Sequence, residues 1–197
     1  MSTNITLGII GSGQLGSLLC QAAKKLKVKT IVISDDKNGP AQKFCDKFGM
    51  KLIPDPSIIS LYGKKVLLMH GDTLCTDDHA YQNFRKLVRS DLWQKEVLKK
   101  TLEERIMLAK ELRQKSLNET GTKKEIIMDV NEDEVEKTFL KYDVNLIIHG
   151  HTHRPNIHIS EFNGQEYKRI VLGDWYNNSF ILKYQKDKIL IEKTSFS

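Results

Sequence analysis

The stretch that decides how this chain is interpreted reads LIIHGHTHRP and spans residues 146–155. Its apolar start predicts a buried strand, and the glycine that follows predicts a turn. Side chains that follow a strand in an α/β protein lie at the carboxyl edge of the sheet, where functional sites are built. His151 and His153 are two residues apart, so both can aim at one centre if the turn bends the backbone.

A second stretch, VLLMHGD at residues 66–72, repeats the pattern of an apolar strand that ends in histidine. Neutral imidazole suits Mn, Fe, Zn or Ni better than Mg or Ca. Alone, a His-Gly-Asp sequence is typical of an ordinary turn, and a His-x-His pair is typical of chance or of a surface feature. Because both follow an apolar strand, the two stretches together predict metal binding.

A glycine-rich loop, GSGQLG at residues 11–16, follows an apolar strand at 5–10 and opens a helix. A second strand at 28–33 completes a Rossmann-like strand–helix–strand unit. Such glycines allow close backbone approach to a phosphate, and an acidic residue about 20 positions on can reach a ribose hydroxyl. Alternatively, the glycines only let the helix pack on the sheet. The residues of this possible nucleotide site are Gly11, Gly13, Gly16 and Asp35.

Beyond residue 50 the pattern predicts short strands, a helix-rich middle and a strand-rich end, which together give an α/β fold. Asn131, three residues before Glu134, is the expected N-cap of a helix that reaches residue 142. Residues 116–124 are expected to form a polar loop. Strands are expected at 51–53, 58–61, 66–69, 145–148, 156–162, 167–172, 179–184 and 189–193, and helices over 80–115 and 129–142.

Length and composition set the class of protein. The 197 residues are 40% hydrophobic and carry 31 Lys and Arg against 25 Asp and Glu, which excludes a disordered or fibrous chain. Such a length fits one large domain or two small ones. The three cysteines are widely spaced, which favours free thiols over a disulfide framework. With no apolar run of about 20 residues and no signal-peptide pattern, a cytoplasmic protein is expected.

The net charge of +6 is concentrated in residues 80–125, which contain twelve Lys and Arg and seven Asp and Glu. Apolar residues at positions 98, 102, 106, 109 and 112 interleave with these charges at helical spacing. This basic helical insert suits an anionic membrane surface, or its apolar stripe packs on the protein body; both remain open. Nucleic acid is not an expected partner, because the sequence has no zinc-finger spacing, RNP-like strand or recognition-helix pair.

The first 45 residues resemble the N-terminus of the ATP-grasp family of 5-(carboxyamino)imidazole ribonucleotide synthases. The resemblance lies in residues 7–16, 30–33 and 39–42. It implies that residues 1–45 form an incomplete nucleotide-binding-type unit. Synthase activity is not expected, because that family grips ATP mainly with later domains.

From about residue 44 the chain resembles the UDP-2,3-diacylglucosamine hydrolase family of calcineurin-like metallophosphoesterases. The resemblance implies that residues 46–197 form the C-terminal portion of such a domain, a partial sandwich interrupted by the helical insert. It also implies hydrolysis of the pyrophosphate of UDP-2,3-diacylglucosamine to a lipid monophosphate and UMP in lipid A synthesis, with two Mn ions, at the cytoplasmic face of an inner membrane. The stretches that carry it are 49–54, 61–63, 70–78, 127–131, 149–155 and 171–175.

The same resemblance assigns roles to single residues. His70, His151 and His153 match metal ligands, and Asp72 would orient the loop that holds His70. Thr120 stands where the family commonly has Asn. The substrate-contacting positions are Asp78, Ser116, Thr120, Lys123 and His151.

Motifs that the family places before this region are missing from residues 1–44. They are an Asp-x-His pair, a following Asp and a Gly-Asn-Arg/His-Asp loop. Paired metal ions need carboxylates, and three imidazoles alone would hold one Mn weakly or none. The sequence therefore predicts an impaired hydrolase with a join near residues 42–49. The alternatives are a non-catalytic nucleotide- or metal-binding module, or a fusion product without a defined function. The oligomeric state is left open.

Overall fold

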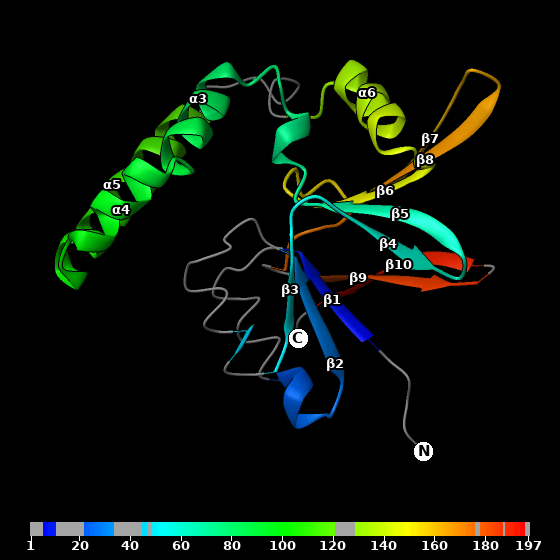
Figure 1. The fold of residues 1–197 in the computed structure, drawn as a ribbon, viewed down its shortest axis with the longest axis horizontal. Coiled ribbons are helices and arrows are strands. Elements are labelled where there is room, and N and C mark those ends of the chain that lie inside the picture. Colours follow the sequence, from blue (N-terminus) through cyan, green and yellow to red (C-terminus); the bar gives the residue numbers. More distant parts are fainter. Residues whose placement is uncertain are drawn as a thin grey trace. The chain divides into compact units, whose positions relative to one another are not determined.

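The structure is a computed structural model that describes residues 6–10, 22–33, 45–46, 49–120, 129–175, 178–186 and 188–195 (Figure 1). The predicted residues Gly11, Gly13, Gly16, Asp35 and Lys123 lie outside these ranges. The chain divides into two compact units. One comprises Met1–Asp72 with Glu136–Ser197, and the other comprises Thr73–Val135.

The first unit contains a three-stranded parallel sheet in the order β1-β2-β3. Its strands are β1 (Thr6–Ile10), β2 (Lys29–Ile33) and β3 (Lys51–Ile53). Ile9, Val32 and Cys45 form its buried core. Strands β1 and β2 precede the expected join near residues 42–49 and β3 follows it, so the sheet contains strands from both sides of the join. The division into domains 1–45 and 46–197 stays a prediction.

The same unit contains a five-stranded mixed sheet, in the order β4-β5-β6-β8-β7. Its three inner strands are parallel and its two edge strands are antiparallel to their neighbours. All four residues of β6 are buried, as expected for a central strand covered on both faces. The strands are β4 (Ser57–Leu61), β5 (Lys64–Met69), β6 (Leu146–His149), β7 (Asn156–Phe162) and β8 (Gln165–Val171).

A two-stranded hairpin of β9 (Asn178–Gln185) and β10 (Lys188–Ser195) packs against this sheet. Leu182, Tyr184, Ile189 and Ile191 alternate along the hairpin and contact the buried cluster of the five-stranded sheet. Fully burying one such aliphatic side chain stabilises a fold by about 1.5–3 kcal/mol. The two layers therefore form a sandwich around one apolar core, whose buried members are Val66, Leu146, Ile148 and Ile170.

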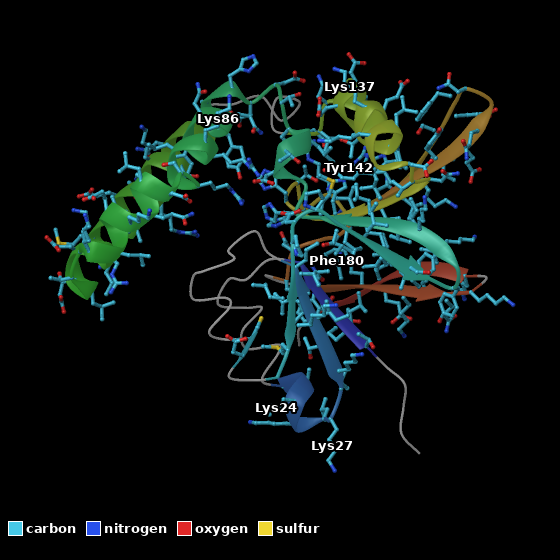
Figure 2. The ribbon with its side chains drawn as sticks, in the orientation of Figure 1. Lys24, Lys27, Lys86, Lys137, Tyr142 and Phe180 are labelled. Carbon is cyan, nitrogen blue, oxygen red and sulfur yellow. The ribbon has the colours of Figure 1, made fainter. Side chains whose placement is uncertain are left out.

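The second unit is helical. It contains the three helices of the basic insert, one of which carries Lys86 (Figure 2), and a short 3₁₀ helix, η1 (Asp72–Leu74), begins at the last residue of the first unit's N-terminal segment and ends in the second unit. A further helix, α6 (Glu132–Tyr142), begins in this unit and ends in the first. Asn131 caps it as predicted, since its side chain accepts a hydrogen bond from Glu134 N–H at 3.0 Å. The insert helices are α3 (His79–Val88), α4 (Asp91–Lys99) and α5 (Leu102–Thr120).

The predicted α/β class is confirmed, and the described strands match the predicted ones to within about two residues. One prediction is wrong: residues 116–120 continue α5 instead of starting a polar loop. Ser, Leu, Asn and Glu are tolerated in a helix, and the first strong helix breaker in the sequence is Gly121. Cys45 and Cys75 are buried free thiols, as predicted. Among the described residues, no helix is long and apolar enough to cross a bilayer.

Candidate functional site at the carboxyl ends of β5 and β6

The two histidine-containing stretches meet at one edge of the five-stranded sheet. Strands β5 and β6 are parallel neighbours, with Met69 opposite His149. His70 directly follows β5, and His151 lies two residues beyond β6. The ring centroids of His70 and His151 are 5.0 Å apart, with the ring planes inclined by 60°. The strand pairing thus brings together two of the three predicted ligands.

The loop after β6 is bent by an unusual backbone conformation. His151 and His153 have φ angles of +63° and +54°, in the left-handed region that few residues other than glycine adopt. Gly150 N–H donates to the carbonyl oxygen of His70 at 3.0 Å, and Thr152 N–H donates to that of Gly150 at 2.8 Å. The turn therefore bends as the sequence requires. Non-glycine residues held in this region are frequent at functional sites.

Two aspartates surround His70. Its backbone N–H donates to Asp55 Oδ1 at 2.9 Å, which ties the end of β5 to the segment between β3 and β4. Asp72 is 1% exposed, and its Oδ1 lies 3.2 Å from His70 Nδ1. This position is consistent with the orienting role expected for Asp72. The role of Asp55 was not predicted, because an Asp between two prolines reads as a turn residue.

His149 forms the buried floor of the site. It is fully buried, and burial is the main reason why its pKa falls to about 4, so the imidazole is neutral at pH 7. Its Nε2 lies 3.3 Å from the Arg169 guanidinium and its Nδ1 lies 3.0 Å from the Gly150 carbonyl. Since a guanidinium only donates, Nε2 accepts and Nδ1–H donates to Gly150.

Gly71 packs directly on this imidazole. A Cβ at Gly71 would lie 2.6 Å from His149 Nδ1, and its φ of +105° is one that side chains rarely permit. The loops after β5 and β6 therefore approach each other over His149. The sequence shows His149 within the motif but gives no sign that it supports both loops.

The third predicted ligand has a different neighbour. His153 Nδ1 lies 3.9 Å from Asp174 Oδ2, and the His153 side chain is 48% exposed. Asp174 lies in a segment fixed on both sides. Leu172 N–H donates to the carbonyl oxygen of His149 at 2.8 Å, and Trp175 Nε1–H donates to that of Phe180, labelled in Figure 2, at 3.0 Å.

The donors of the first unit thus come in close pairs, His70 with Asp72 and His153 with Asp174. Within the part of the chain that the structure describes, no three His, Cys, Asp or Glu side chains converge closely enough to hold a metal ion. These residues do not fit the paired Mn site that the family resemblance implies. The ligand assignments of His70, His151 and His153 remain predictions.

The predicted substrate residues lie in the second unit. Asp78 is buried, and its Oδ1 accepts a hydrogen bond from Tyr81 N–H at 3.0 Å, so it caps α3. Asp78 is therefore a buried capping residue and not a solvated loop residue. Ser116 is exposed on α5, and Thr120 is the last residue of that helix. Their contacts with substrate stay predictions.

The N-terminal part of the chain matches a known family. Residues 4–71 match the family described as the ribonucleotide synthetase preATP-grasp domain. The match starts at the predicted ATP-grasp-like segment and continues through β5. It is consistent with the parallel sheet of β1, β2 and β3.

Three curated relatives show the second similarity. UDP-2,3-diacylglucosamine hydrolase of Marinobacter nauticus is 45% identical over 147 residues, which cover 75% of this chain and 60% of the relative. The hydrolase of Xanthomonas campestris pv. campestris is 41% identical over 157 residues, covering 76% and 64%. The hydrolase of Yersinia pseudotuberculosis is 44% identical over 148 residues, covering 75% and 62%.

The chain spans about three fifths of the length of the curated relatives it matches. At this level of identity, about three quarters of the chain is homologous to proteins that are all named UDP-2,3-diacylglucosamine hydrolase. The two resemblances found in the sequence, to UDP-2,3-diacylglucosamine hydrolases and to the preATP-grasp domain of ribonucleotide synthetases, are therefore both confirmed.

Proposed function

We propose that this chain binds UDP-2,3-diacylglucosamine and hydrolyses its pyrophosphate bond to give a lipid monophosphate and UMP. It would act in lipid A synthesis, at a lower rate than the hydrolases it resembles. The observation that carries the proposal is the meeting of His70 and His151, 5.0 Å apart between ring centroids, at the ends of two parallel strands. The 41–45% identity to UDP-2,3-diacylglucosamine hydrolases supplies the substrate class.

The reduced rate follows from the donor set. A phosphoesterase that uses two ions needs ligands that converge on both of them. Here the described donors form pairs, and no three of them converge. We expect His70, His151 and His153 to hold one Mn ion weakly or none.

The residues of the site still have chemistry to offer a phosphate. The imidazoles of His70 and His151 can donate hydrogen bonds to phosphate oxygens, and such charge-assisted bonds are stronger than neutral ones. The buried carboxylate of Asp72, whose Oδ1 lies 3.2 Å from His70 Nδ1, can orient that imidazole. The left-handed turn at His151 and His153 fixes the direction in which both side chains project.

The basic helical insert supports a peripheral position on the anionic, cytoplasmic surface of an inner membrane. Helices α3 and α4 have no buried residue among their described positions, and several large apolar side chains on the insert are more than 40% exposed. Exposed apolar groups beside many lysines suit anionic lipid headgroups and the acyl chains of a lipid substrate. These side chains are Leu87, Leu92, Leu98, Leu102, Ile106 and Met107.

The test is an assay of UMP release from UDP-2,3-diacylglucosamine with Mn²⁺ present. An intact UDP-2,3-diacylglucosamine hydrolase is assayed alongside, and the double variant His70→Ala/His151→Ala serves as the control. We expect release about a thousandfold slower than by the intact enzyme, which corresponds to about 4 kcal/mol of activation free energy, and no release by the variant. Release at the rate of the intact enzyme contradicts the proposed impairment. Equal release by the variant contradicts the site.

A Mn²⁺ titration followed by electron paramagnetic resonance tests the metal content independently of activity. We expect at most one weakly bound ion per chain, removed by His151→Ala/His153→Ala. Two tightly bound ions would contradict the expected weak, single-ion donor set.

The pairing of donors also favours a second candidate, a non-catalytic nucleotide- or metal-binding module. It predicts binding of UDP-2,3-diacylglucosamine or Mn²⁺ with no UMP release above the variant. A fusion product without a defined function predicts neither binding nor release. Equilibrium binding measured beside the UMP assay separates the three.

A further inference from the structure

A hollow lies at the end of the five-stranded sheet opposite to the histidines. It consists of two adjoining cavities of about 490 Å³ each, which share Lys64, Lys168, Tyr184 and Ile189. The other charged side chains of the lining are Lys65, Asp143, Glu166, Lys186 and Lys188. All of these belong to the first compact unit.

The strand register separates this hollow from the histidine site. Lys64 begins β5 and His70 follows its end, while Leu146 begins β6 and pairs with Lys168. At about 3.3 Å per residue, the six residues of β5 place the two ends roughly 20 Å apart. The hollow is therefore a separate site.

The lining is rich in lysine. Lys65 pairs with Asp143 at 2.7 Å, and Lys168 lies 3.8 Å from Glu166. Among the described residues, no acidic group pairs with Lys64, Lys186 or Lys188. Asp187, which lies between Lys186 and Lys188 in the sequence, is outside the described ranges. Three ammonium groups are thus left around one concavity, where walls of low dielectric strengthen the attraction of an anion.

The wall beside these lysines is aromatic and aliphatic. Tyr184 and Ile189 face inward from the hairpin and belong to the apolar layer of the sandwich. The Tyr184 ring stacks on Tyr62, with centroids 6.0 Å apart and planes inclined by 17°. A rigid aromatic surface next to lysines is suited to a ligand that has both a phosphate and an uncharged body.

We propose that this hollow, the basic hollow, binds a small phosphate monoester. The ammonium groups of Lys64, Lys186 and Lys188 hold the phosphate, and the body of the ligand lies against Tyr184. Binding is electrostatic and involves no bond formation. The proposal does not depend on the proposed hydrolase function, because it uses none of the histidines.

The test is a ¹H–¹⁵N NMR titration of the full chain with inorganic phosphate, ribose 5-phosphate and AMP. We expect saturable binding in the millimolar range or tighter, with shifts in the resonances of Lys64, Tyr184 and Lys188. Added salt should weaken it, because ions screen exposed charges. If AMP binds tighter than phosphate and Tyr184→Leu removes the difference, the body of the ligand contacts Tyr184. If all three bind equally, phosphate alone is recognised and the contact with Tyr184 is wrong.

The double variant Lys64→Gln/Lys188→Gln should weaken binding about tenfold. The matched control Lys29→Gln/Lys51→Gln removes two exposed lysines from β2 and β3 and should leave binding unchanged. Equal weakening in both variants would mean a general effect of net charge and would overturn the proposal. Absence of saturation in the wild-type chain would overturn it as well.

A third variant separates this site from the histidines. His151→Ala/His153→Ala should leave the titration unchanged, whatever it does to UMP release. Loss of binding in that variant would assign the phosphate to the histidine site and overturn the proposal. Thermal unfolding of each variant verifies that it is folded.

Discussion

The guanidinium of Arg169 donates a hydrogen bond to Nε2 of His149 at 3.3 Å, and both side chains are almost completely buried. A permanent cation beside an imidazole excludes a proton from that nitrogen. The second ring nitrogen is engaged by Gly150, so the imidazole is held as one neutral tautomer. This arrangement supports the loops that carry His70 and His151.

The first prediction concerns acid stability. His149 has a folded pKa of about 4, lowered mainly by burial and also by Arg169, His151 and His158, against about 6.5 in an unfolded chain. Between these values the unfolded state binds more protons, so stability falls as the pH drops from 6.5 towards 4. The full loss from this group is about 3 kcal/mol. Urea unfolding at several pH values measures it.

The control for acid stability is His149→Gln, which removes the titrating group and keeps a polar side chain. Whatever its stability at pH 7, its free energy of unfolding should depend less on pH between 6.5 and 4. The same dependence in both proteins would mean that other groups cause it.

The second prediction concerns the close approach of the loops. Gly71→Ala places a Cβ 2.6 Å from His149 Nδ1 at a φ of +105°, whereas Gly63→Ala, at a φ of +80°, meets no atom within 4 Å. Gly63→Ala should cost about 1 kcal/mol from backbone conformation alone. Gly71→Ala should cost roughly 2 kcal/mol more from the steric clash. Equal losses in urea unfolding would show that the loops yield without cost.

The third prediction separates two roles of Asp78. Because Asp78 is the N-cap of α3, Asp78→Ala should lower the free energy of unfolding of the protein by about 1 kcal/mol. Asp78→Asn should lower it much less, because the asparagine side chain can still accept the hydrogen bond from Tyr81 N–H. If its charge contacts substrate, Asp78→Asn should weaken binding of UDP-2,3-diacylglucosamine while stability is retained. Unchanged binding by Asp78→Asn would leave only the structural role.

The fourth prediction concerns the membrane. The triple variant Leu98→Ser/Leu102→Ser/Ile106→Ser removes apolar side chains that are 58%, 60% and 46% exposed on the insert. Cosedimentation with phosphatidylglycerol vesicles should fall at least about tenfold. The control is Ile159→Ser on β7, which removes an equally exposed apolar group (62%) from the first unit. Equal loss in the control would contradict a membrane role of the insert.

The sequence predicted most of the secondary structure because its periodicities are local. The strand before His149 and the cap at Asn131 each depend on neighbouring residues, and the structure has both. The end of α5 was predicted too early because polar residues alone do not stop a helix.

The site was predictable only in part. His70 and His151 could be placed at one edge because parallel strands bring their carboxyl ends together. The support by Arg169, His149 and Asp55 could not be predicted, since these contacts join residues 15 or 20 positions apart that no spacing rule connects. The pairing of His153 with Asp174 likewise depends on the loop after β8.

The pairing of β3 with β2 has a consequence for any attempt to cut the chain in two. Val32 of β2 and Leu52 of β3 lie opposite each other, so strands from before and after residues 42–49 pair in one sheet. Removing residues 1–45 would remove β2, the neighbour of β3, and expose the hydrogen-bonding groups along that edge of β3. An exposed strand edge promotes aggregation. A loss of activity in such a shortened chain would reflect the disruption of β3. The activity of the hydrolase-like portion is therefore better measured in the full-length chain.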